Sequence, residues 1–224
     1  MYEEARQRRD ATIALLERES IPYLPSLPLI EAEADITPKA PHEILKKFLT
    51  TLFTIQLAFD VQAGGDTDKP MALYANTLQA YGIEVADLSA DEITIWNKTC
   101  TEQDITNMVW RYEAIWLLFW AMGFIDTLPY PSDICDVHAM LNIVSPVNDS
   151  LDVLLSKVYM RTKKELLDMS DYIYCLRWAS VDAHINDRPQ PAGLNASVLV
   201  ERHRAINWLT LADEDDFDNV SLDT

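Results

Sequence analysis

The stretch WRYEAIWLLFWAMG, Trp110–Gly123, is the densest run of large apolar and aromatic side chains in the chain. Thr101 begins a capping box, which predicts that a helix starts there. Gly123 can take the left-handed backbone conformation that ends a helix. From Ala114 onward the helix is apolar on every side, as is typical of a helix enclosed by protein. The apolar run is shorter than the about 20 residues that a membrane span needs, so we expect a core helix over 101–123.

The rest of the chain also favours helices. Its 224 residues include 11 Pro and only 5 Gly, and its apolar residues recur at helical spacing. The sequence therefore predicts an all-α protein, a single-domain orthogonal bundle of roughly eight helices with Pro-rich connecting segments over 1–224. Residues 1–40 are expected to form an N-terminal helix and a Pro-rich extended arm, and 213–224 an acidic tail. Helices are expected at 3–20, from 41 onward, and at 70–81, 89–98, 101–123, 132–144, 150–158, 162–185 and 196–211.

The acidic tail carries apolar side chains that a purely solvated tail does not need, namely Phe217, Val220 and Leu222. It also follows directly on a helix with a basic edge. We therefore expect 217–222 to dock on the body of the protein, while 213–216 stays solvated.

The chain is strongly acidic, with 18 Lys and Arg against 36 Asp and Glu and a net charge of −18. Such a surface repels phosphate backbones and anionic lipids, which argues against nucleic acid and membrane as partners. The charge either serves solubility alone or suits a protein partner with a basic surface. The three cysteines are an odd set, which favours reduced thiols in a cytoplasmic protein. The first ten residues are charged, so we see no signal peptide.

Several charges lie in the most apolar helices without an opposite charge three or four residues away, where exposed helices usually pair them. These are Arg111, Glu113, Asp171, Arg177, Asp182 and Arg202. Because unpaired buried charges are costly, we infer a cluster that joins the helices 101–123, 162–185 and 196–211. His203 and Asn207, four residues apart on one helix face, are expected to join it.

The cluster allows two interpretations. It either fixes how the helices dock, or it lines a cleft in which His203, beside a carboxylate and a tyrosine, does acid–base work. Cys135 and His138 have metal-ligand spacing but lack a second close pair, so no metal site is predicted. No phosphate-binding loop, nucleophile elbow or dinucleotide fingerprint occurs, so no cofactor is predicted.

A family resemblance is carried by blocks that follow one another along the chain: WRYEAIWLLFWAMG at 110–123, LPYPSDICDV at 128–137, RWASVDAHIN at 177–186, PAGL at 191–194, VERHRAINWL at 200–209 and FDNVSLDT at 217–224. In these blocks the chain resembles the bacterial "domain of unknown function" family 4272. The resemblance covers most of the chain and is specific, because the blocks occur in order at familiar spacing. It implies no established activity, so no catalytic residue carries over from it.

Two functions remain open at this point. The first is a non-enzymatic protein-interaction role, as an adaptor or an immunity-type protein that neutralises a basic target. The second is an enzyme or a small-ligand binder that uses the Arg/Asp/Glu/His cluster. A closed cluster with every group paired would favour the first, and a deep pocket with Arg177, Asp182 and His203 on its wall would favour the second. The oligomeric state cannot be inferred from the sequence.

Overall fold

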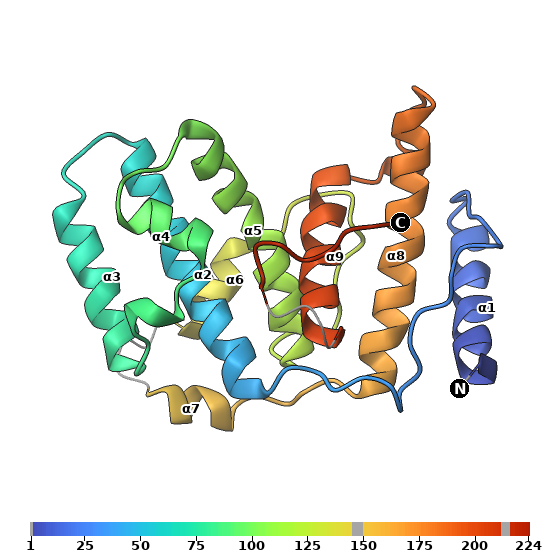
Figure 1. Cartoon of the computed structure of the whole chain (residues 1–224), viewed down its shortest axis with the longest axis horizontal. Helices are drawn as coiled ribbons and strands as arrows, with labels where there is room; N and C mark the ends of the chain where they lie inside the picture. The colour runs from blue at the N-terminus through green and yellow to red at the C-terminus, as the bar shows by residue number, and fades with distance from the viewer. Residues whose placement is uncertain (1, 145–149, 212–215) are drawn as a thin grey trace. The chain divides into compact units, whose positions relative to one another are not determined.

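The computed structural model describes residues 2–144, 150–211 and 216–224, and the protein is all-α, as predicted (Figure 1). No strand occurs in these ranges. Among the described residues, no helix is both long and apolar enough to cross a membrane. The helices are α1 (Tyr2–Arg18), α2 (Pro41–Gln62), α3 (Asp68–Ala80), α4 (Ala90–Trp96), α5 (Glu102–Ala121), α6 (Val137–Val144), α7 (Leu151–Ser156), α8 (Lys163–Ile185) and α9 (Ala196–Thr210), with short 3-10 turns at Val85–Asp87 and Pro191–Gly193.

The chain divides into two compact units. Unit 1 comprises Met1–Lys39, Leu128–Ile134 and Arg161–Thr224, and unit 2 comprises Ala40–Thr127 and Cys135–Met160. Unit 1 therefore contains α1, α8 and α9, and unit 2 contains α2 to α7. The organisation of 1–224 as one domain stays a prediction.

The core of unit 2 is built on α5, which packs against α2. Every residue of α5 from Arg111 to Ala121 is buried, including Trp116 and Trp120. The Phe119 ring stacks on Phe48 of α2, with ring centroids 5.5 Å apart. The prediction of a core helix around Trp110–Gly123 is thus confirmed. Its stretch that is apolar on every side is buried by the surrounding protein, as such a stretch requires.

Helix starts follow the side chains that the sequence offers for capping. The Thr101 hydroxyl accepts a hydrogen bond from the Asp104 N–H at 3.2 Å, and the Asp104 carboxylate accepts from the Thr101 N–H at 2.7 Å. Thr162 caps α8 in the same way, and the Asn195 side chain accepts from two N–H groups at the start of α9. Each cap satisfies N–H groups that have no partner inside the helix.

One helix start differs from its prediction. A helix was expected over 132–144, but α6 begins only at Val137. The Cys135 N–H donates to the buried carboxylate of Glu113 in α5. The segment before α6 is therefore held by a side chain of a neighbouring helix rather than by its own helical hydrogen bonds.

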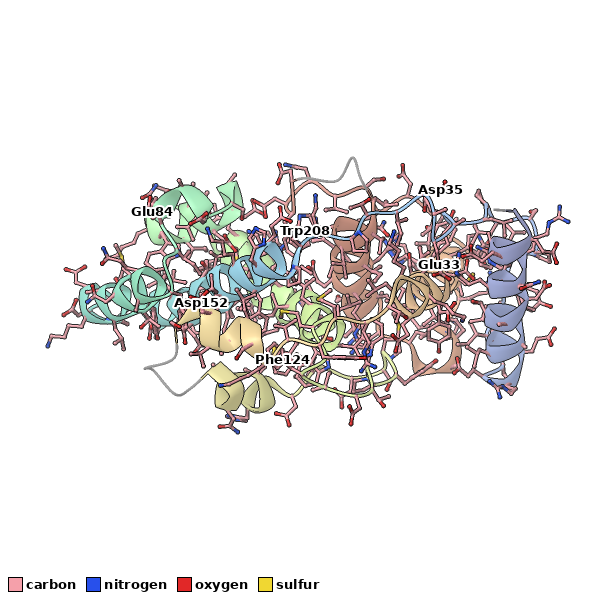
Figure 2. The ribbon with its side chains drawn as sticks, turned by 90° about the horizontal axis from the view of Figure 1, so that it is seen from below. Glu33, Asp35, Glu84, Phe124, Asp152 and Trp208 are labelled. Atoms are coloured by element: carbon pink, nitrogen blue, oxygen red, sulfur yellow. The ribbon has the colours of Figure 1, made fainter. Side chains whose placement is uncertain are left out.

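Unit 1 packs α1, α8 and α9 with the arm that leaves α1. Its core is a cluster of apolar side chains from all four parts: Leu16, Ile21, Leu27, Cys175, Leu176, Ala179, Leu194 and Leu199. The arm has no regular secondary structure between Leu29 and Ala40 apart from one turn, and Glu33 and Asp35 lie along it (Figure 2). Prolines keep the arm out of a helix, so its carbonyl groups need partners from elsewhere.

The end of α5 yields a test of packing. Gly123 and Gly82 both have left-handed backbones, with φ of 78° and 71°. A Cβ on Gly123 would collide with the Tyr159 carbonyl, whereas a Cβ on Gly82 would meet nothing within 4 Å. We expect Gly82→Ala to lower the free energy of unfolding by about 1 kcal/mol through strain alone, and Gly123→Ala to lower it by about 3 kcal/mol. Urea titration of both variants measures this, and equal losses would contradict the collision.

Candidate functional site

Asp171 is a buried carboxylate on α8, and its cation is Arg9 on α1. The Arg9 Nη2 lies 2.7 Å from Asp171 Oδ1, and Arg9 Nε lies 3.1 Å from the same oxygen. Arg9 also donates to the carbonyl oxygens of Leu27 and Pro28 at 2.8 and 2.9 Å. Burial opposes the charge of Arg9, but the hydrogen bonds and the charge of Asp171 outweigh it and raise the pKa of Arg9. The predicted buried acid is confirmed, with a partner that the sequence analysis did not name.

Asp182 has a different surrounding from the one predicted. Its carboxylate forms an ion pair with Arg188, just beyond the end of α8, and accepts from the Asn186 side-chain amide at 3.0 Å. The side chains are part-exposed, at 29% for Asp182 and 51% for Arg188. The test for opposite charges three or four residues away missed this pair because Arg188 follows six residues later, where the helix has ended.

Three further charges of the predicted cluster, Arg202, Arg111 and Glu113, are buried. Arg202 in unit 1 donates to the carbonyl oxygen of Pro129. In unit 2, Arg111 pairs with Asp91 at 3.2 Å, and Glu113 accepts from the Cys135 N–H. Because the predicted cluster includes residues of both units, a meeting of all its charges stays a prediction.

His203 and Asn207 lie together on α9, as predicted, and Tyr174 of α8 lies beside them. The His203 Nε2 is 3.0 Å from the Asn207 Nδ2, and the rings of Tyr174 and His203 have centroids 6.1 Å apart. Asn207 Nδ2 also donates to the carbonyl oxygen of Ser221 at 3.0 Å. A carbonyl oxygen can only accept, so the amide NH₂ group faces Ser221, and its second proton is directed to His203 Nε2. The proton of a neutral His203 is therefore on Nδ1.

The electrostatics around His203 keep it neutral. Burial, together with the positive charge of Arg177, lowers the pKa of His203 to about 4. Burial also lowers the pKa of Arg177. Among the described residues, neither the His203 Nδ1 nor the Arg177 Nε has a hydrogen-bond partner. The α8–α9 face thus presents two buried N–H donors without an acceptor.

This arrangement differs from the acid–base site that the sequence allowed. That mechanism places a carboxylate beside His203, whereas the structure places the Asn207 amide there. Asp171 and Asp182 are engaged with Arg9 and Arg188. The geometry is suited to holding a hydrogen-bond acceptor, because the groups left without a partner, His203 Nδ1 and Arg177 Nε, are donors.

The C-terminal segment, which we define as residues 216–224, crosses α9 toward α8 (Figure 1). Phe217 is buried, with its ring edge-on to Trp208 at a centroid distance of 5.3 Å, and Val220 is also buried. Arg204 of α9 donates to the Asp218 carbonyl at 2.8 Å. The predicted docking is confirmed. Asp216 is exposed, and the rest of the predicted solvated part, 213–215, lies outside the described residues.

Cys135 and His138, which have metal-ligand spacing in the sequence, differ in their surroundings. The Cys135 side chain is buried and the His138 side chain is exposed to solvent. Across 2–144, 150–211 and 216–224, no group of three or more His, Cys, Asp or Glu side chains is placed to hold a metal ion.

Comparison with known proteins gives one match. The family model described as "Domain of unknown function (DUF4272)" matches residues 8–220. No curated protein matches the sequence. No solved structure matches it either.

The two ion pairs that α8 forms, Asp171 with Arg9 and Asp182 with Arg188, allow a matched test of stability. Asp171→Asn leaves the buried cation Arg9 without its counter-charge and is expected to lower the free energy of unfolding by about 3–5 kcal/mol. Asp182→Asn breaks a part-exposed pair and is expected to cost less than about 1 kcal/mol. Chemical denaturation of both variants measures the difference, and similar losses would show that the Arg9–Asp171 pair is not the stronger constraint.

His203 predicts a pH dependence of stability. Its pKa in the folded protein, about 4, lies below the value of about 6.5 for an unfolded chain. As the pH falls through 6.5 the unfolded chain takes up the proton first, so stability present above pH 6.5 is lost as the pH falls toward 4. The full loss amounts to about 3 kcal/mol. It should be absent in His203→Gln and retained in His42→Gln, which changes an exposed histidine; an identical pH profile in all three proteins would refute the assignment.

Proposed function

Since the chain belongs to the DUF4272 family of domains of unknown function, whose description assigns no activity, we propose a function from its charges: a non-enzymatic cytoplasmic protein that binds the basic surface of a partner protein. Its role would be that of an adaptor or of an immunity-type protein that neutralises a basic target.

The observation that carries this proposal is the neutrality of the buried charges. The buried cations are Arg8, Arg9, Arg111 and Arg202, and the buried acids are Glu92, Glu113, Asp171 and Glu201. These two sets cancel. The net charge of −18 therefore falls on the residues that solvent reaches and on those outside the described ranges. A surface of this kind attracts and orients a basic partner.

Several basic side chains are occupied by hydrogen bonds inside the protein, which makes the surface more negative. Arg8 donates to the Glu31 carbonyl, Arg9 to Leu27 and Pro28, and Lys163 to Ile36. Side chains bound in this way contribute less to an external surface, whereas acids such as Asp35, Glu84 and Asp152 are exposed in both units (Figure 2).

An enzyme using the cluster is the alternative, and it has less support. Its carboxylates on α8 are each bound to an arginine, and His203 has an amide as its neighbour. General acid–base catalysis needs a group whose proton can be exchanged with a substrate. The pairing supports a structural role for Asp171 instead.

The proposal is tested by capture and titration. The purified chain is used to capture partners from the cytoplasm of its host, and the recovered protein is purified and titrated against the chain at increasing salt. We expect a partner with a basic surface and an affinity that falls steeply with ionic strength, because screening weakens charge pairing between exposed groups.

Variants of exposed acids show which unit contacts the partner. Glu84→Gln with Asp152→Asn neutralises exposed acids of unit 2, and Asp10→Asn with Glu17→Gln does so in unit 1. One pair should weaken binding about tenfold, whereas the matched control Lys69→Gln with Lys98→Gln should not weaken it. An affinity that does not change between low and high salt would refute the charge-based interaction.

A further inference from the structure

Arg177 differs from other arginines of this protein in having no counter-ion. Arg8, Arg9 and Arg111 each pair with a carboxylate. Among the described residues, Arg177 has no ion pair and its Nε has no hydrogen-bond partner. Leaving a partly buried cation unpaired is costly, because burial removes the water that stabilises its charge. An acid-rich chain that leaves this partly buried arginine without a carboxylate leaves its charge to be balanced by an anion from outside.

The second observation is the neighbouring histidine. His203 is 2% exposed, and its ring orientation is set by Asn207, which Ser221 in turn orients. The result is an Nδ1–H group that needs an acceptor and has none among the described residues. A water molecule could accept from this N–H, but it would leave the charge of Arg177 unbalanced. An anionic oxygen satisfies both groups.

We propose that Arg177, His203 and Tyr174 form a binding site for a small oxyanion, a carboxylate or a phosphate, on the α8–α9 face of unit 1 beneath the C-terminal segment. Arg177 supplies the positive charge and its N–H donors, and His203 supplies the Nδ1–H. Tyr174, whose ring centroid lies 6.1 Å from that of His203, supplies its hydroxyl as a third donor. This site is independent of the acidic surface of the proposed function.

The surroundings make the site selective. The acidic exterior repels anions in general, so a bound oxyanion must be held by these local donors and not by the overall field. Arg177 is only partly buried, so part of its side chain is in reach of an anion from solvent. Asp223 in the C-terminal segment lies close enough to contribute to a raised pKa of Tyr174, behind the larger effect of burial. Its negative charge opposes binding.

The experiment titrates the full chain with sodium phosphate and, separately, with sodium acetate, against sodium chloride at the same ionic strength. Thermal unfolding and the side-chain ¹⁵N signals of His203 are recorded. We expect a rise in melting temperature and a shift of the His203 Nδ1 signal with at least one oxyanion. A response to phosphate alone identifies a phosphate site, and a response to acetate alone a carboxylate site. No response to either overturns the proposal.

Matched variants separate this site from general anion effects. Arg177→Gln should weaken the response about tenfold or more, since it removes the charged donor. Arg188→Gln, which changes an exposed arginine of the same unit, should leave it intact. An equal rise in melting temperature in Arg177→Gln would overturn the proposal. If Arg177→Gln does not fold, the His203 signals of the unaltered chain decide: an Nδ1 signal that stays fixed during both titrations refutes the site.

Discussion

Unit 1 depends on the hydrogen bonds and the ion pair that the buried guanidinium of Arg9 forms. One side chain from α1 binds Asp171 of α8 and the carbonyl oxygens of Leu27 and Pro28 in the following arm. It therefore fixes three segments relative to one another. A buried ion pair adds little stability compared with apolar packing, but a misplaced partner leaves an uncompensated charge. The pair thus specifies where α1 and the arm lie, while the apolar cluster around Leu16 and Leu176 supplies the favourable burial.

The same solution recurs in other irregular segments of unit 1. Carbonyl groups in irregular segments have no helical donor, and burying them unpaired costs free energy. Basic side chains supply the donors: Arg202 binds the Pro129 carbonyl, and Arg204 binds Asp218 in the C-terminal segment. Lys163, at the start of α8, binds the carbonyl of Ile36. In a chain with few cations, many of them hold irregular backbone in place.

The sequence predicted local features well, because their causes are local. Thr101, Thr162 and Asn195 cap helices through groups two or three residues away, and the apolar stretch around Trp116 marks that part of α5 as core. The docked tail was predicted from Phe217, an apolar side chain in an acidic segment.

The charged partners were harder to predict. Arg9 lies in a helix rich in charges and looks solvated, and Asp171 is 162 residues away in the sequence. No periodicity connects the two. The tautomer of His203 depends on the carbonyl of Ser221, which carries no sequence signal at all. Helical spacing identified His203 and Asn207 as neighbours, but what they face is decided by a segment that returns from the C-terminus.

Several cations of this protein bind groups in its interior, whereas most of its acids lie at the surface, and this difference has a consequence for function. Fold and surface are under different constraints: an arginine such as Arg9 or Arg202 is buried and bound to groups inside the protein, whereas an acid such as Asp152 is exposed to solvent. Replacing an exposed acid changes the field felt by a partner but little of the packing. Replacing a buried arginine releases a carboxylate or a backbone carbonyl from its donor and destabilises the unit. The acidic surface can therefore change while the internal cations preserve the fold, and the proposed function, recognition of a partner by charge, would rest on this independence.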